Sequence, residues 1–151
     1  MRIFIGADHR GHLLKEEIKT VLAEMGHDVD DKGTHSEDSC DYPDSAYAVA
    51  SHVARTEGSR GVLVCMSGIG QSIAANKVPG AYAALCYNKE AAAFSREHNN
   101  ANILVLGAKF IKQDELKDIL ETWLSTEFEG GRHQQRVDKI KSIEEKLYKA
   151  A

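Results

Sequence analysis

The chain has 151 residues, of which 42% are hydrophobic and 28% are charged, a length and composition typical of a single globular domain with a substantial core. Its formal net charge of −4 provides no general positive field for holding nucleic acid or an anionic membrane. The first ten residues include charges, and no apolar stretch is long enough for a signal peptide or a membrane span. We therefore expect a cytoplasmic protein, one domain over residues 1–151, that binds neither nucleic acid nor membrane.

Five short β-branched or apolar runs, each followed by a segment of helical periodicity, divide the chain. The expected strands are Arg2–Gly6, Asp28–Asp31, Gly61–Cys65, Ala81–Leu85 and Asn102–Leu106. Two apolar stripes indicate the helices after the first and fifth strands: Leu14, Ile18, Val21, Leu22 and Met25, and then Leu116, Ile119, Leu120, Trp123 and Leu124. Strands joined by helices pair in parallel through right-handed crossovers. We therefore expect an α/β fold, a Rossmann-like three-layer sandwich with a five-stranded parallel sheet.

Two segments lie outside this alternation. Residues Lys32–Asp44, with the sequence KGTHSEDSCDYPD, are expected to be irregular. The pair Gly130-Gly131 interrupts the chain before a last helix, expected at about residues 132–149. The apolar stripe of that helix consists of Val137, Ile140, Ile143 and Leu147. A helix with one apolar stripe needs an apolar surface to cover, and we expect a partner subunit to provide it.

The loop after the third expected strand is the first candidate for chemistry, because ligands of open parallel sheets bind beyond the carboxyl ends of the strands. That strand ends at Cys65, and the residues MSGIG follow at 66–70. Gly68 and Gly70 allow a tight turn and present N–H groups at the start of a helix, where negative charge is favoured. A thiol beside these donors is expected to ionise more readily than a free one and to act as a base. The alternative is a small buried residue that ends a strand, which is the commoner role of a cysteine.

The sequence gives little support for nucleotide binding, disulfide bonds or a metal site. The segment SGIGQS matches neither the phosphate-binding loop of nucleotide hydrolases nor a complete dinucleotide fingerprint. The three cysteines, Cys40, Cys65 and Cys86, are widely spaced and form no C-x-x-C pair, so neither a disulfide framework nor a zinc site is indicated. His9 and His12 lie close together but lack acidic or cysteine partners at ligand spacing. We expect free thiols and no metal site.

Further charged side chains are expected to contribute. Asp8 and His9 follow the first strand and Lys109 follows the fifth, so all three should lie at the same edge of the sheet. Arg132 and Arg136 are four residues apart on the last helix, where their Cβ atoms would be roughly 6 Å apart on one face. That spacing suits binding of one phosphate from two sides, and the open alternative is a solvated basic face.

His98 and Asn99 end the helix that precedes the fifth strand. This is the amino-terminal side of the sheet, opposite Cys65, so the imidazole and the thiol should not meet within one subunit. Either His98 is structural, or a dimer brings it to its neighbour's thiol. Taken alone, a histidine near a helix end is usually a capping or surface group.

Long strings of the sequence resemble one known family. GADHRGHLLKEEI, DKGTHSEDSCDYPD, CMSGIGQSIAANK, SREHNNANILVLGA and EGGRHQQRV, in this order, resemble the type B ribose-5-phosphate isomerases, a family that includes allose-6-phosphate and galactose-6-phosphate isomerases. The resemblance spans nearly the whole chain. It implies a homodimer with active sites shared between subunits, and a phosphorylated sugar as substrate. The reaction would move a proton between C1 and C2 through a cis-enediolate, which requires no metal or organic cofactor.

The resemblance also implies roles for single residues. Cys65 matches the catalytic base, and His98 matches the residue that opens the furanose ring, with Asn99 beside it. Asp8 and His9 match a pair that contacts the substrate.

The remaining implied contacts bind the sugar and its phosphate. Arg132 and Arg136 match phosphate ligands, Lys109 stands in the phosphate site where an arginine is common, and Tyr42 is placed to touch the sugar. The loop that would stabilise the enediolate oxygen consists of Met66, Ser67, Gly68, Ile69 and Gly70.

Two further departures from the family pattern bear on specificity and mechanism. Met66 replaces a usual glycine, and Gln71 stands where some relatives carry a glutamate base, so this chain depends on Cys65. The size of the sugar, from four to six carbons, and the choice between a dimer and a dimer of dimers stay open. A non-catalytic domain that senses a sugar phosphate or a nucleotide is the alternative to an isomerase.

Overall fold

The structure, a computed structural model, describes residues 1–149. One sheet contains all five strands, which pair in parallel in the order β2-β1-β3-β5-β4. The strands are β1 (Arg2–Ala7), β2 (Asp28–Asp31), β3 (Arg60–Cys65), β4 (Ala83–Leu85) and β5 (Ile103–Gly107). The expected α/β fold with a five-stranded parallel sheet is confirmed.

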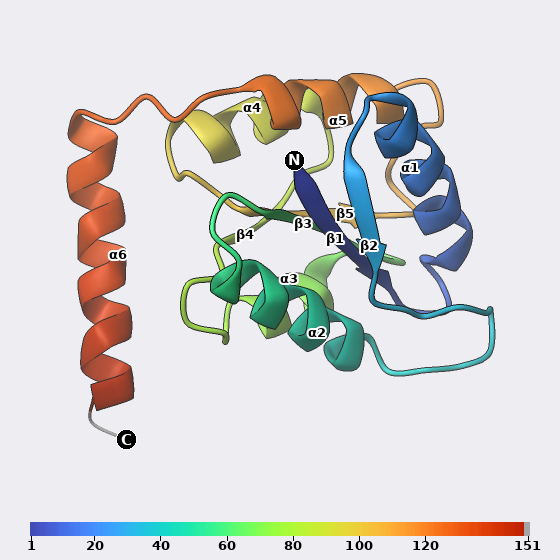
Figure 1. Cartoon of the computed structure of the whole chain (residues 1–151), viewed down its shortest axis with the longest axis horizontal. Coiled ribbons are helices and arrows are strands. Elements are labelled where there is room, and N and C mark those ends of the chain that lie inside the picture. The colour runs from blue at the N-terminus through green and yellow to red at the C-terminus, as the bar shows by residue number, and fades with distance from the viewer. Residues whose placement is uncertain (150–151) are drawn as a thin grey trace.

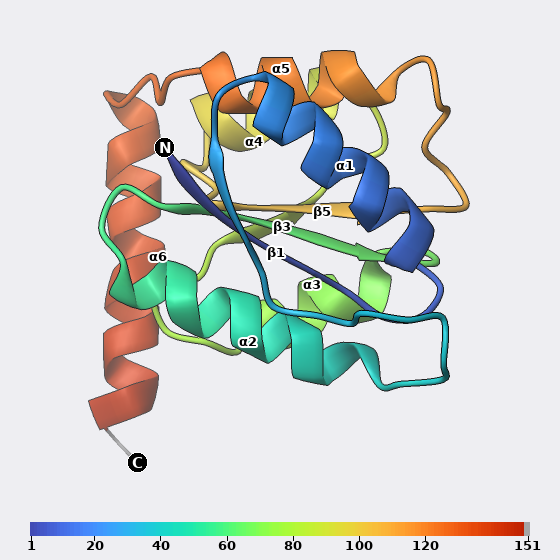
Figure 2. The same ribbon diagram turned by 45° about the vertical axis from the view of Figure 1, so that its right-hand side comes forward.

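Five of the six helices cover the two faces of this sheet. The helices are α1 (His12–Glu24), α2 (Tyr42–Arg55), α3 (Ile69–Ala75), α4 (Lys89–Glu97), α5 (Leu116–Ser125) and α6 (Arg132–Lys149). Helices α1, α4 and α5 lie on one face and α2 and α3 on the other, which makes the three layers (Figures 1 and 2). No helix within residues 1–149 is long and apolar enough to cross a bilayer.

The core has two halves because strand side chains alternate between the faces of the sheet. In β1, Ile3 and Ile5 join Trp123 of α5 in the larger cluster, whereas Phe4 points to the opposite face and joins Val49 of α2. All five of these side chains are at most 2% exposed. Burial on both faces explains why β1, β3 and β5 are nearly continuous apolar runs in the sequence.

The segment between β2 and α2 is irregular, as the sequence predicted, except at its end. Residues 42–44 belong to α2, which begins at Tyr42 with Pro43 in its first turn. A proline there has no N–H to lose, because the first N–H groups of a helix have no partner within the helix, and so it favours a helix start rather than a break.

Helix α6 lies beside the amino-terminal ends of β1 and β3, and the arrowheads of both strands point away from it (Figure 2). The expected stripe of four apolar residues divides between two faces of this helix. Val137 is 2% exposed and faces its own chain, whereas Ile140, Ile143 and Leu147 are 44%, 58% and 66% exposed. The grouping of Val137 with the others was therefore wrong, because α6 packs Val137, together with His133 one turn before it, against its own chain.

Candidate active site

The turn from β3 into α3 shapes the first part of the candidate site. Cys65 ends β3 and is 5% exposed, and its Sγ accepts a hydrogen bond from the N–H of Gly68 at 3.1 Å. Gly68 has a φ of 82°, in the left-handed region that glycine adopts without a steric penalty. The chain reverses at this glycine and α3 begins at the next residue, so backbone donors converge on the sulfur.

The thiol does not have the expected low pKa. Burial raises the pKa of Cys65 above its ordinary value, and the nearby charge of Asp8 acts in the same direction. Backbone N–H groups of Gly68, Gln71 and Ser67 oppose the rise but do not overcome it. The prediction of easier ionisation was therefore wrong for the chain by itself, because the cost of desolvating a thiolate outweighs three hydrogen bonds.

Two side chains at the end of β1 fix the neighbouring backbone. Asp8 is 6% exposed, and its Oδ1 accepts hydrogen bonds from the N–H groups of Arg10 and Gly11, both at 3.0 Å. His9 Nδ1 lies 3.2 Å from both the nitrogen and the carbonyl oxygen of Cys40. Asp8 thus holds the turn into α1, and His9 ties that turn to the irregular segment before α2.

Tyr42 and Lys109 complete this edge of the sheet. A Cβ atom at Gly70 would lie 2.8 Å from the hydroxyl of Tyr42, and closer still to its ring, so only glycine at this position lets the ring lie on the loop. The N–H of Lys109 donates to the carbonyl of Met66 at 3.0 Å, which joins the turn after β5 to the same loop. The side chains of Met66 and Ile69 are 47% and 52% exposed.

We call these residues the carboxyl-edge group: Asp8, His9, Tyr42, Cys65, Met66, Ser67, Gly68, Ile69, Gly70 and Lys109. One buried neighbour also belongs here. Gln71 is fully buried, its Nε2 donates to Ser45 Oγ at 3.0 Å, and its Oε1 has no partner within residues 1–149.

His98 lies at the other edge of the sheet, where it caps the carboxyl end of α4. Its ring stacks between those of Phe94 and His133, with centroid distances of 4.9 and 4.2 Å. His133 Nε2 lies 3.2 Å from a carboxylate oxygen of Glu129. The sequence reading missed His133; its spacing of four residues from Glu129, across the start of the last helix, was the available signal.

Ligand atoms of His98, Glu129 and His133 lie within 4.8 Å of one another, which raises the question of a metal ion. The two imidazole planes are inclined by only 9° and stacked face to face. Imidazole donates to a metal through a lone pair in the plane of the ring, so two stacked, nearly parallel rings do not direct their lone pairs at one ion. The geometry suits a stacked imidazole pair with a carboxylate beside it.

Arg132 and Arg136 lie on the exposed side of α6, and neither takes part in an ion pair with any residue in the described part of the chain. With His98 and Asn99 they make the amino-edge group. The candidate residues thus form two groups at opposite edges of one sheet, and one chain does not bring the thiol and the imidazole together.

Comparison with known proteins identifies the family of this chain. The sequence model of the ribose/galactose isomerases matches residues 3–140. The chain belongs to the ribose/galactose isomerase family. The resemblance found in the sequence is therefore confirmed at the level of the family.

One relative is ribose-5-phosphate isomerase B of Escherichia coli, which is 45% identical to this chain over 145 residues. The aligned part covers 96% of this chain and 97% of that protein. Ribose-5-phosphate isomerase B of Clostridium thermocellum superimposes with a TM-score of 0.95 at 52% identity, over 97% of this chain and 99% of that one. The Mycoplasma genitalium enzyme with bound ribulose-5-phosphate gives a TM-score of 0.92 at 41% identity, over 95% and 96% of the two chains.

Proposed function

We propose that this family member is an aldose–ketose isomerase that interconverts ribose 5-phosphate and ribulose 5-phosphate, as a homodimer with two shared active sites. The main support for shared sites is that the candidate residues lie at two opposite edges of the sheet, so that one chain alone does not assemble a complete site. The relatives named above are ribose-5-phosphate isomerases, and one of them holds the ketose product.

The exposed stripe of α6 supports the dimer. Arg132 and Arg136 continue the line of Ile140, Ile143 and Leu147, so the cations and the exposed apolar residues share one side of the helix. A second copy that covers this stripe with its carboxyl-edge group would bury the apolar residues and bring the two guanidinium groups to the loop after Cys65. The same contact would deliver His98, which lies beside the start of α6 through its stack on His133.

The proposed reaction begins with opening of the furanose ring. The partner's His98 takes the proton of the C1 hydroxyl and delivers it to the ring oxygen as the bond between C1 and that oxygen breaks, which yields the open-chain aldehyde. The two arginines of the same subunit, with Lys109 from the other, would hold the phosphate at a fixed distance from C1 and C2.

Proton transfer follows at the other side of the shared site. Cys65, as a thiolate, removes the proton from C2 and returns it to C1, while the hydroxyl proton passes from O2 to O1 across the cis-enediolate. The negative charge resides on the enediolate oxygen between these steps. Backbone N–H groups of residues 67–70 would stabilise that oxygen, since the same turn already directs donors at the sulfur. Because burial raises the pKa of the thiol, deprotonation of Cys65 is a required step before catalysis.

The test uses two variants and a matched control. Cys65→Ala should lower kcat for ribose 5-phosphate by about 10²–10⁴-fold, measured by the absorbance of the ketose. Cys86→Ala, at the other buried thiol, is the control and should keep nearly normal rates. His98→Asn should impair the reaction of ribose 5-phosphate and spare erythrose 4-phosphate, which cannot close a furanose ring. Near-normal turnover in Cys65→Ala would remove the proposed base, and equal losses on both sugars would remove the ring-opening role of His98.

The non-catalytic sensor has one observation in its favour, the raised pKa of Cys65. The test covers roughly pH 6 to pH 9, in which a perturbed thiol titrates. Saturable binding of ribose 5-phosphate over this range without formation of any ketose would establish the sensor and refute the isomerase.

A further inference from the structure

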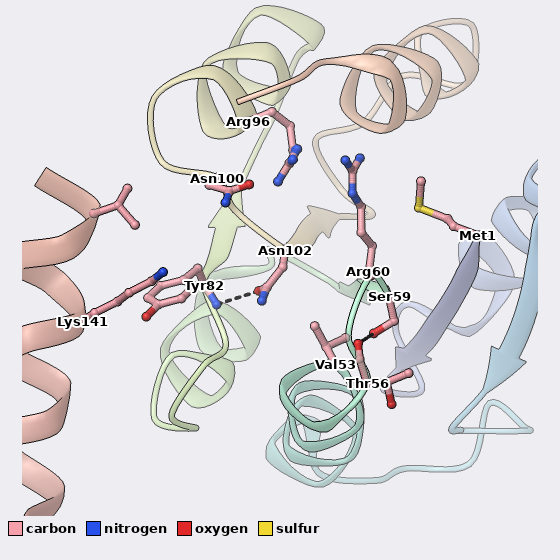
Figure 3. Close-up of a pocket in the computed structure, with 12 residues that line it drawn as sticks. Met1, Val53, Thr56, Ser59, Arg60, Tyr82, Arg96, Asn100, Asn102 and Lys141 are labelled. Atoms are coloured by element: carbon pink, nitrogen blue, oxygen red, sulfur yellow. Dashed lines mark hydrogen bonds between the residues drawn. The ribbon is translucent and has the colours of Figure 1, made fainter. Parts of the chain in front are cut away.

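A pocket of about 400 Å³ opens at the amino-terminal ends of the strands, between the sheet and α6 (Figure 3). It lies on the opposite side of the molecule from Cys65. Its wall includes Arg60 at the start of β3, Arg96 in the last turn of α4, and Lys141 of α6. None of these three side chains has a role in the isomerase reaction proposed above, and their charges need an explanation.

The two guanidinium groups point into the same space from opposite walls (Figure 3). Arg96 is 5% exposed and donates to the carbonyls of Ala101, at 2.6 Å, and Thr126, at 3.4 Å. Those bonds use Nη1 and Nε and leave Nη2 without a partner in the described part of the chain.

Arg60 is held just as firmly. Its Nη1 donates to the last carbonyls of α5, Trp123 at 2.9 Å and Leu124 at 3.0 Å, and its guanidinium lies over the indole ring of Trp123 at 5.2 Å. Capping of α5 therefore accounts for one nitrogen of Arg60, and Nε and Nη2 have no partner within residues 1–149. Each guanidinium offers five N–H donors, so both retain unused donors at the pocket.

No carboxylate neutralises this pair. Among residues 1–149, neither Arg60 nor Arg96 has a carboxylate oxygen within 4.0 Å. Burial and the charge of Arg60 lower the pKa of Arg96 to about 10, and the exposed Glu127 only partly opposes this. The other acidic group nearby, Glu144, is occupied by the N–H of Gly80 and the hydroxyl of Tyr82.

Lys141 adds a third cation from α6, and its side chain extends toward the pocket beside Tyr82 (Figure 3). The amide of Asn100 lies at the same rim (Figure 3). A pocket with two fixed guanidinium groups, an exposed ammonium and no carboxylate among its lining residues is complementary to an oxyanion, which guanidinium binds in a bidentate manner. Its volume is in the range of small-molecule sites and exceeds what a lone inorganic ion needs.

We propose that this pocket binds a small organic anion through a phosphate or carboxylate group held between Arg60 and Arg96, at a site separate from the sugar-phosphate site. Lys141 closes over the bound group from α6. Because α6 also carries Arg132 and Arg136, and Asn100 follows the segment of His98, an occupied pocket contacts both elements of the amino-edge group.

The experiment is a titration of the full chain, labelled at arginine nitrogen, with inorganic phosphate and separately with succinate. The Nε–H resonances of Arg60 and Arg96 are followed by NMR, with sodium chloride at equal ionic strength as the reference for screening. All titrations are repeated in the Arg132→Ala/Arg136→Ala variant, which lacks the two arginines proposed for the other site. The two anions show whether phosphate, carboxylate or both are accepted.

Lys141→Glu is the test variant and Lys139→Glu is its matched control, because both lysines are exposed on α6 but only Lys141 lines the pocket. We expect saturable shifts of both arginine resonances with at least one anion, in the native chain and in the double variant. Lys141→Glu should weaken binding roughly tenfold, as expected for loss of a charge-assisted contact, and Lys139→Glu much less.

Three results would overturn the proposal. One is a response to both anions that is linear and no larger than that to chloride. Another is equal weakening by Lys141→Glu and Lys139→Glu, which would indicate only the long-range field of α6. The last is loss of the response in the Arg132→Ala/Arg136→Ala variant, which would place the anion at the other site.

Discussion

Replacing Asp31 by asparagine should destabilise the protein in a pH-dependent way. The carboxylate of Asp31 accepts hydrogen bonds from Lys15 Nζ at 2.7 Å and Lys19 Nζ at 2.8 Å, and from the N–H of Gly33 at 2.9 Å. Lys15 is fully buried and also donates to the carbonyl of Thr34 at 2.6 Å. Asp31 and Lys15 therefore hold the start of the irregular segment between β2 and α2. That segment reaches the candidate site through Cys40.

The magnitude follows from the pKa of Asp31. Burial alone would raise this pKa, but the bonds from Lys15, Lys19 and Gly33 lower it from 3.8 to about 2. That difference corresponds to about 2.4 kcal/mol, which we reduce to about 2 kcal/mol because the side chain is 14% exposed. A carboxyl group with a lowered pKa in the folded state contributes stability above its unfolded value, and this stability is lost as the pH falls from about 4 to about 2.

The assay is urea unfolding across the acidic range at one protomer concentration. Near neutral pH, Asp31→Asn should lower the free energy of unfolding by about 3 kcal/mol, because it removes the nearest counter-ion of the buried ammonium of Lys15 and leaves it only the more distant Glu16, at 3.6 Å. The difference from the native chain should shrink by about 2 kcal/mol as the pH falls toward 2. Asp28→Asn, on the same strand and exposed, is the control. A difference that is independent of pH, or one that Asp28→Asn reproduces, would refute the reasoning.

The other predictions concern the proposed reaction. Because burial raises the pKa of Cys65, kcat/KM should rise with pH from neutral into the alkaline range, and a flat profile would contradict a titrating thiol base. Ile143→Asp, on the exposed stripe of α6, should dissociate the dimer in sedimentation and abolish turnover, while Ser142→Asp, exposed on another side of the same helix, should do neither; an active monomer would exclude shared sites. Gly70→Ala should lower kcat by roughly tenfold or more with the fold intact, because its Cβ displaces the ring of Tyr42, and normal kinetics would show that the ring does not hold the loop.

Much of the fold could be predicted because its causes are local in the sequence. Apolar runs of strand length, helical stripes and the glycines of 68–70 each act within a few residues, and right-handed crossovers then fix a parallel sheet. That topology also implied that Cys65 and His98 lie at opposite edges, which the structure shows. The family was readable because its strings run through nearly the whole chain.

The failed and missing predictions share a different cause. Val137 turns inward although its apolar neighbours on α6 stay exposed, and the stack of His133 on His98 joins two helices that are distant in sequence. Neither arrangement follows from periodicity, since both depend on which surface α6 meets.

The sequence by itself determined the succession of strands and helices along the chain, the loop after Cys65 and the family. The tertiary structure alone decided the direction of the thiol's pKa shift and the meeting of Arg60 with Arg96 in one pocket. Desolvation and the field of a neighbouring charge depend on distances between segments far apart in the chain, and those distances exist only after folding.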